Sequence, residues 1–330
     1  MTDPSSFWPL VIVALSFVSV TSLWPKSRER RPKGTRRHVA RVVPVIPLIA
    51  YDDDCDASEG SSPESGVAVR DVSYDTDAEC DEPTGLTSAF RLEVAGRTDC
   101  GLRRKTNEDR LLVLEKDHVF VVADGMGGHA GGALASELAV NAIAEALAAV
   151  DSNTESDGRV PRQAAALVSA VGAANDAVRR AADAHDRYAD MGTTVVAMRF
   201  CPRKGRLYVT HVGDSRCYRL RGGKLRQVTL DHTMTALGVT GPAAHHLSRA
   251  VGTRDQVEPD LVVLRPELGD QYVLCSDGLT RMVSDDAIAT VIAGALDVEE
   301  AADELVRVAN ARGGKDNVTA IVVRVMPKAA

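Results

Sequence analysis

Aspartates in five short motifs are the residues of this sequence whose types and spacing suit chemistry. The motifs are NED (107–109), DGMGGH (124–129), GDS (213–215), SDG (276–278) and GGKDN (313–317). Each borders an apolar run with the length and alternation of a β-strand, so the acids are expected at strand ends and in turns. Aspartates that converge without matching lysines or arginines repel one another unless a cation neutralises them. The pattern therefore predicts a metal site.

The available ligands favour Mg²⁺ or Mn²⁺, because these cations prefer carboxylate oxygens and the motifs offer no cluster of histidines or cysteines. None of the six cysteines forms CxxC or another zinc-type spacing, and their scatter indicates reduced thiols. Glycines next to Asp124 and Asp277 would let the backbone approach the ion closely.

Each motif has a simpler interpretation when it is taken alone. Asp-Gly is foremost a turn signal, SDG can cap a helix, and GDS or GGKDN can form a tight turn. Gly125, Gly127 and Ala130 also fit a loose dinucleotide-binding fingerprint, since they follow a strand and open a helix. Asp124 argues against that alternative, because its carboxylate would face a pyrophosphate. Only the combination of the motifs, in this order, is specific.

The elements that must position these motifs form hairpin-like sets of strands with helices between them. Strands are expected over 91–100, 110–117, 118–124, 192–200, 205–214, 216–225, twice within 261–278, and over 317–326. Helices are expected over 131–150, 162–185, 285–296 and 299–311. This order predicts an α+β fold rather than a regular strand–helix alternation, and it places one domain at residues 89–330.

The composition argues against a nucleic-acid partner. The chain of 330 residues has a net charge of −7, and only 4% of its residues are aromatic. A surface that binds phosphates along a nucleic acid should be basic, and one that stacks bases should carry aromatic side chains. Hydrophobic residues make up 45% of the chain, which is enough for a sizeable core.

Residues 1–50 are expected to anchor the protein in a membrane. Residues 7–24 form an uncharged apolar run with Trp8 and Trp24 near its ends, at the lower length limit for a membrane-spanning helix. Eight lysines or arginines and one glutamate follow in 26–41, which predicts that this side is cytoplasmic. A secretory signal peptide is the main alternative, although it would carry positive charge before the apolar run. A hydrophobic tail without a function is another.

Residues 51–88 are expected to form a flexible acidic linker. Twelve acids and one arginine lie in 52–82, and apolar residues are few throughout the segment. Such a composition cannot bury enough surface to offset the entropy lost on folding. The predicted location is therefore the inner membrane, with the domain at 89–330 in the cytoplasm on a tether; a wholly cytoplasmic protein is the alternative.

Six longer motifs follow one another between residues 101 and 319. They are GLRRKTNED (101–109), ADGMGGHAGGALAS (123–136), MGTT (191–194), HVGDSR (211–216), CSDGL (275–279) and GGKDNVT (313–319). In this order they resemble the metal-dependent protein phosphatases of type 2C, in their bacterial form, over about residues 90–326. The resemblance implies a four-layer α/β/β/α sandwich of two antiparallel sheets flanked by helices, with a two-metal centre at one edge.

The resemblance also implies the metal ligands. Asp124 would bridge two Mn²⁺ or Mg²⁺ ions, and the carbonyl of Gly125 would bind one of them. Asp277 and Asp316 would complete the shell of the other ion. Two such ions lower the pKa of a bridging water, so that hydroxide can attack phosphorus in line without a phosphoenzyme.

Further residues match the family around these ligands. Asp109 and Glu108 match an acidic pair that holds metal-bound waters, and Asp214 matches an acid that helps hold a third, weaker metal. Arg104 stands where the family places its phosphate-binding arginine. Arg103 is the alternative, because the two side chains would point to opposite faces if this segment were a strand. His129 could protonate the leaving alkoxide, or it could be a polar residue of a glycine-rich loop.

The implied activity is hydrolysis of phosphoserine and phosphothreonine in proteins, with bacterial Ser/Thr kinases or their targets as partners. A catalytically silent, membrane-tethered phosphoprotein-binding module is the alternative, and such a module would be expected to lack one or more metal aspartates. A small-molecule phosphatase is a third possibility. The stretch 231–258 is shorter than the flap of bacterial relatives and lacks their Arg-Asn pair after a proline, which affects contacts with substrate rather than the metal site.

Deletion of residues 1–44 tests the predicted anchor. Each lysine or arginine near an anionic leaflet contributes roughly 1 kcal/mol to membrane binding, so the basic segment should hold even a shallow insertion. The full-length protein should therefore sediment with membranes, and the deleted protein should be found in the supernatant with unchanged peptide turnover. A full-length protein that stays in the supernatant after fractionation would contradict the anchor.

Overall fold

Two β-sheets form the centre of the domain in the computed structural model, which describes residues 72–74, 90–127, 130–149 and 161–328. The strands of the first sheet are, in spatial order, β1 (Val72–Tyr74), β10 (Asp260–Leu264), β7 (Arg206–Val212), β6 (Val195–Cys201), β4 (Val119–Met126) and β3 (Asp109–Leu114), with β5 (Gly192–Thr193) paired to β4. Those of the second are β2 (Phe90–Asp99), β12 (Val318–Pro327), β11 (Gln271–Cys275), β8 (Arg216–Arg221) and β9 (Lys224–Gln227).

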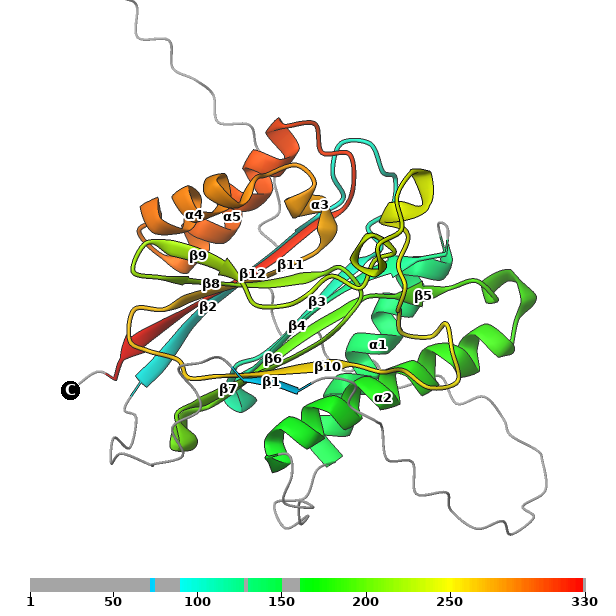
Figure 1. Ribbon diagram of the computed structural model, residues 1–330, viewed down its shortest axis with the longest axis horizontal. Coiled ribbons are helices and arrows are strands. Elements are labelled where there is room, and N and C mark those ends of the chain that lie inside the picture. Colours follow the sequence, from blue (N-terminus) through cyan, green and yellow to red (C-terminus); the bar gives the residue numbers. More distant parts are fainter. Residues whose placement is uncertain (1–71, 75–89, 128–129, 150–160, 329–330) are drawn as a thin grey trace, which may run out of the picture. The chain divides into compact units, whose positions relative to one another are not determined.

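Helices cover the outer face of each sheet (Figure 1). The first sheet carries α1 (Ala130–Ala149) and α2 (Arg162–Asp183), and the second carries α4 (Asp285–Gly294) and α5 (Val298–Ala311), while α3 (Asp277–Thr280) is a single turn after β11. Short 3-10 turns lie at Glu115–Asp117, Asp186–Tyr188, Pro202–Lys204, Thr235–Leu237 and Pro242–His245. This arrangement confirms the predicted α+β sandwich of two sheets flanked by helices.

Three apolar clusters hold the four layers together. One lies between α1, α2 and the first sheet, a second lies between the second sheet and α3, α4 and α5, and the third lies between the sheets. Strand β4 shows how the sequence produces this: Val119, Val121 and Ala123 face the helices, while Phe120 and Val122 face the other sheet. Because side chains alternate along a strand, a strand buried on both faces reads as an unbroken apolar run.

Helix α1 is apolar enough and long enough to resemble a membrane span, and it is the one such helix in the described ranges. It packs against α2 and β4, and Ala135, Ala139 and Ile143 are fully buried there. Its composition is therefore that of a core helix.

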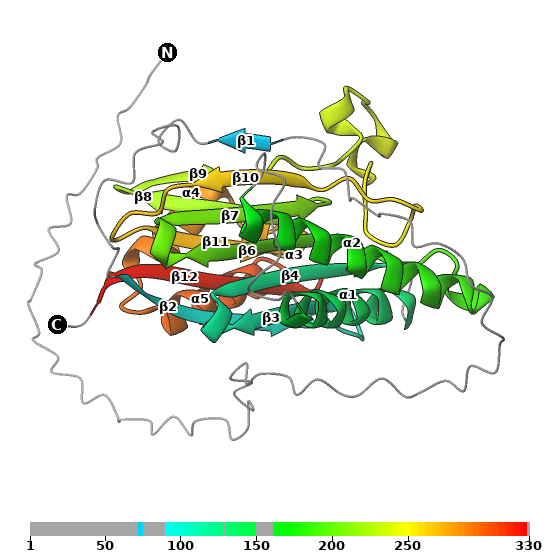
Figure 2. The ribbon, with the colours of Figure 1, turned by 90° about the horizontal axis from the view of Figure 1, so that it is seen from below.

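The structure differs from the predicted elements at three places. The run 216–225 is a hairpin, β8 and β9, because Gly222 and Gly223 turn the chain with positive φ angles of 56° and 77°. The strand predicted over 91–100 ends at Asp99, and residues 101–103 form a turn after it. Val72–Tyr74 lie inside the segment predicted to be a linker, yet they form β1, which pairs with β10 and makes a parallel pair (Figure 2).

Candidate metal centre

The register of the β3–β4 pair places two acids directly opposite each other. Asp109 begins β3 and pairs with Asp124 on β4. Opposed residues of antiparallel strands share one face of the sheet, with Cβ atoms about 5 Å apart, and like charges there are destabilising. Asp109 is only 1% exposed, so water cannot screen this repulsion.

Two further acids come from the second sheet. Asp277 follows β11 and begins α3, and Asp316 precedes β12 by two residues. β11 and β12 are antiparallel neighbours in which Cys275 pairs with Ala320, so both acids lie at the same end of the sheet. The predicted convergence of strand-end aspartates is therefore present, and it involves both sheets.

Asn317 ties the turns around these acids together, a role that the motif analysis did not assign. Its Oδ1 accepts a hydrogen bond from the backbone N–H of Glu108 at 2.8 Å. Its Nδ2 donates to the carbonyl oxygens of Cys100 and Thr106, each at 2.9 Å. A Cβ at Gly278 would lie 1.9 Å from the Asn317 carbonyl oxygen, so the SDG turn can approach only because it carries glycine.

One oxygen of Asp109 is held by hydroxyls and the other has no hydrogen-bond partner. Ser276 and Thr319 both donate to Oδ2, each at 2.7 Å. The Oδ1 atom is buried and unpaired in the part of the chain that the structure describes. A buried carboxylate oxygen without a donor is costly, so this atom marks the position of a cation or its bound water.

The electrostatics of Asp109, Asp124 and Asp277 show the same need for a cation. Burial raises the pKa of Asp109 to about 6, and repulsion by Asp316 adds to the rise while hydroxyl donors oppose it. Burial, followed by repulsion from Asp214, raises the pKa of Asp277 to about 7. The pKa of Asp124 lies well above its usual value, because it is buried and because the other acids surround it. These groups are poorly stabilised as carboxylates by the protein alone.

The start of α1 packs against the end of β4 at two glycines. A Cβ on Gly125 would lie 2.0 Å from the carbonyl oxygen of Gly132, and a Cβ on Gly132 would lie 2.3 Å from a carboxylate oxygen of Glu108. The hydroxyl of Ser136 donates to the Glu108 carbonyl oxygen. Gly125 therefore presents backbone rather than a side chain next to Asp124, as a carbonyl ligand must.

Two threonines of the MGTT segment form hydrogen bonds with the backbone of Asp124. Thr193 donates from its hydroxyl to the Asp124 carbonyl oxygen at 2.9 Å, and the Thr194 hydroxyl accepts from the Asp124 N–H at 3.1 Å. The Thr194 and Ser215 hydroxyls are hydrogen-bonded to each other at 2.6 Å. These threonines position the aspartate and do not reach into the acidic cluster themselves.

Asp214 follows β7, and the residue before it, Gly213, is hydrogen-bonded to a histidine. The ring Nδ1 of His232 accepts from the Gly213 N–H (3.2 Å), and the backbone N–H of His232 donates to the Gly213 carbonyl oxygen (2.9 Å). The Nε2 of His232 then donates to Asp260 at 3.1 Å, and Arg249 pairs with the same carboxylate at 2.6 Å. Burial would raise the pKa of Asp260, but these hydrogen bonds hold it well below its usual range.

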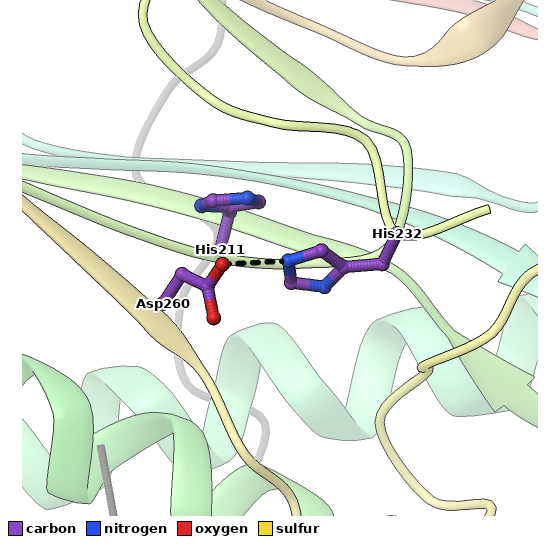
Figure 3. Close-up of side chains that lie close together, drawn as sticks. All are labelled: His211, His232 and Asp260. Carbon is purple, nitrogen blue, oxygen red and sulfur yellow. Dashed lines mark hydrogen bonds and ion pairs between the residues drawn. The ribbon is translucent and has the colours of Figure 1, made fainter. Parts of the chain in front are cut away.

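His211, His232 and Asp260 lie close together on β7, after β9 and on β10 (Figure 3). The His211 and His232 rings are 4.5 Å apart, and burial, followed by the neighbouring His232, lowers the pKa of His211 to about 4. Because Arg249 already neutralises Asp260, a divalent ion would add excess positive charge. We therefore interpret these three residues as a support for the loop that carries Asp214.

Arg104 faces the acids from the turn after β2. Its guanidinium pairs with Asp316 at 2.9 Å, and its side chain is 52% exposed. Both Arg103 and Arg104 lie outside β2, so strand alternation does not separate their side chains. The turn after β2 brings Arg104 to the acidic cluster.

The remaining residues of the motifs are placed as follows. Arg216, the last residue of HVGDSR, pairs with Asp231 through two nitrogens, at 2.9 Å and 2.7 Å, and therefore has a structural role. The four described cysteines, Cys100, Cys201, Cys217 and Cys275, are all free. His129 and residues 1–50 lie outside the described residues, so the proton-donor role and the anchor stay predictions.

The donor set fits divalent cations. Carboxylates of Asp124, Asp277, Asp316 and Asp109, with the Gly125 carbonyl, offer only oxygen atoms, and one of those atoms is buried without a partner. Hard cations such as Mg²⁺ and Mn²⁺ prefer such ligands. The exposed guanidinium of Arg104 beside the acids can in turn bind an anion, so the site can hold a phosphate ester against metal ions.

Residues 102–321 match the family model of protein phosphatase 2C. The chain belongs to this family. It is 38% identical over 245 residues to the serine/threonine protein phosphatase PstP of Mycobacterium tuberculosis, in a match that covers 71% of this chain and 45% of PstP. It is 34% identical over 251 residues to the serine/threonine phosphatase stp of Listeria monocytogenes, covering 69% of this chain and 93% of that protein.

Solved structures agree with the family assignment. PppA of Pseudomonas aeruginosa superposes with a TM-score of 0.63 at 33% identity, over 72% of this chain and 98% of that one. The catalytic domain of PstP in complex with two manganese ions superposes with a TM-score of 0.61 at 36% identity, over 72% and 99%. A relative of this fold therefore binds two manganese ions.

Removal of metal should make the stability of this protein fall as pH rises. The pKa values of Asp109 and Asp277 rise on folding from 3.8 to about 6 and about 7, so their protonation stabilises the folded state. That contribution is complete below pH 3.8 and is lost as pH rises through the folded values. We expect the melting temperature of EDTA-treated protein to fall across this range, and Mn²⁺ to raise it most at the upper end.

Asp277→Asn is the matched variant for this measurement, because it removes the more strongly shifted carboxyl. Its metal-free melting temperature should depend less steeply on pH than that of the wild type. A metal-free wild type whose stability stays level or increases from pH 3.8 to about 7 would contradict the shifted pKa values.

Proposed function

We propose that this chain is a metal-dependent phosphatase that hydrolyses phosphoserine and phosphothreonine in proteins. The observation that carries the proposal is the convergence of Asp109, Asp124, Asp277 and Asp316 at one end of both sheets, with one buried carboxylate oxygen unpaired. The names of the relatives support the protein substrates. The matched part covers less than half of PstP, so the activity is inferred for the domain at 89–330.

In this proposal Asp124, the Gly125 carbonyl, Asp277 and Asp316 would hold two Mn²⁺ or Mg²⁺ ions. When bound, such ions would supply a water of lowered pKa and polarise the phosphoryl oxygens. The residues of the chain do the remaining work by position. Asp109 and Glu108 would orient metal-bound water. The hydrogen bonds of Asn317 to Glu108 and Cys100 hold the start of β3 and the end of β2 in place.

Arg104 orients the phosphoryl group. A guanidinium offers paired N–H donors that match phosphate oxygens and stay charged at any working pH. In the structure this group pairs with Asp316, which metal ions would neutralise, so Arg104 becomes available when the site is loaded. The leaving alkoxide needs a proton, and we propose His129, which lies outside the described residues, as its donor.

The catalytically silent binding module is the less favoured function. Such a module would not need four buried acids whose repulsion costs stability, yet the chain keeps all of them together and supports each through hydroxyls, amides or glycines. We also propose that residues 7–24 hold the domain at the inner membrane, where membrane-bound Ser/Thr kinases or their targets would be its substrates.

The first test is metal-dependent release of phosphate from a phosphothreonine peptide by residues 88–330. Hydrolysis should require Mn²⁺ or Mg²⁺ and stop in EDTA, and Asp316→Asn should lower kcat by about 100-fold or more, because several kcal/mol of metal stabilisation are lost. The KM should change much less. Full activity in EDTA, or a trapped phosphoenzyme, would contradict the mechanism, and faster turnover of nucleotides or sugar phosphates would point to a small-molecule phosphatase.

The second test separates the two neighbouring arginines. Arg104→Ala should raise KM for the peptide about 10-fold, because one charged hydrogen-bonding partner of the phosphate is lost, while Mn²⁺ binding is retained. Arg103→Ala is the matched control and should change KM little. The opposite result, with Arg103→Ala impaired and Arg104→Ala normal, would show that the turn presents the other arginine to substrate.

A further inference from the structure

Arg281 lies between two acids of the candidate metal centre, and no motif in the sequence singled it out. Its guanidinium pairs with a carboxylate oxygen of Asp277 at 2.6 Å and lies 3.8 Å from a carboxylate oxygen of Asp214. Both distances are measured from the same nitrogen, Nη2. One positive charge therefore faces the two carboxylates at the point where they approach each other.

The backbone fixes where this side chain starts. Arg281 is four residues after Asp277, and its N–H donates to the Asp277 carbonyl oxygen at 2.8 Å across the turn of α3. Residues four apart on a helical turn share one face, so the arginine side chain is directed to the aspartate rather than away from it. Its 51% exposed side chain leaves the guanidinium partly open to solvent.

The other arginine whose charge acts on Asp214 already has a partner. Arg216 is held by two bonds to Asp231. Asp214 itself is only 9% exposed, so water neutralises it poorly. Arg281 is the cation in place to balance its charge.

We propose that the guanidinium of Arg281 takes the place of a third divalent ion beside Asp214, so that this protein binds two metal ions and not three. The inference rests on the proposed function, since it concerns how many ions the same acidic cluster holds. A third ion between Asp214 and Asp277 would have to displace the guanidinium or lie within a few ångströms of it. Like charges at that distance repel strongly in a partly buried site.

The proposal gives Arg281 a positioning role. By bonding to one oxygen of Asp277 it fixes the rotation of that carboxylate, and the other oxygen is left for a metal ion. It also holds the Asp214 loop and the SDG turn together without an ion whose occupancy would vary with metal concentration.

The test is to count the Mn²⁺ ions that bind to the chain of residues 1–330. Equilibrium dialysis at millimolar free Mn²⁺, followed by elemental analysis, gives ions per chain without reference to activity. The wild type should bind two, and Arg281→Gln, which keeps the length of the side chain and removes its charge, should bind three. The double variant Arg281→Gln with Asp214→Asn should return to two.

Arg307→Gln is the matched control, because Arg307 is an exposed helical arginine whose partner is Glu304 rather than an acid of the site. It should bind two ions. A wild type that binds three ions, or an Arg281→Gln variant that still binds two, would overturn the role of Arg281 and leave the two-metal phosphatase intact. A wild type that binds no Mn²⁺ would overturn both the inference and the proposed function.

Discussion

Repulsion among buried carboxylates is the constraint on which the rest of this structure depends. Asp109 and Asp124 oppose each other across two strands, and Asp277 and Asp316 approach them from the other sheet. A fold driven by the hydrophobic effect gains nothing from this arrangement, which persists because the surrounding core fixes the strands that carry the acids. Positive charge must therefore be supplied at this edge, by metal ions and by arginines.

The two sheets supply different residues of the candidate metal centre. The first sheet supplies the opposed acids and the glycine contact that exposes the Gly125 carbonyl, while the second supplies Asp277, Asp316 and the hydroxyls that hold Asp109. Because neither sheet carries a complete site, the packing between them decides the distances within it. The apolar cluster between the sheets is thus also what brings the acids of the candidate metal centre together.

Arginines surround the acids in distinct ways. Arg104 reaches Asp316 from an exposed turn and can exchange that partner for a phosphate, whereas Arg281 is tied through its backbone to the turn that carries Asp277. Arg249 acts at a distance, since it neutralises Asp260, which orients His232 against the Gly213 loop. Three separate ion pairs therefore place positive charge around the acidic cluster and the Gly213 loop.

The sequence by itself determined the elements and the chemical class of the site. Unbroken apolar runs identified strands buried on both faces, and Asp-Gly and Asp-Asn pairs at their ends identified the acids, because both signals are local. It could not separate the β8–β9 hairpin from one strand, since Gly222 and Gly223 act through backbone geometry that the pattern of apolar residues does not record.

Only the tertiary structure decided which distant residues meet. The bonds from Asn317 to Glu108 and Cys100, and the ion pair between Arg281 and Asp214, join segments that are far apart in the chain, and their residue types are common in ordinary turns. The ion pair between Arg104 and Asp316 likewise depends on the turn after β2, and not on the alternation of side chains along a strand. The local sequence determines the chemistry that a side chain offers, whereas the packing of the two sheets determines which partners that side chain meets.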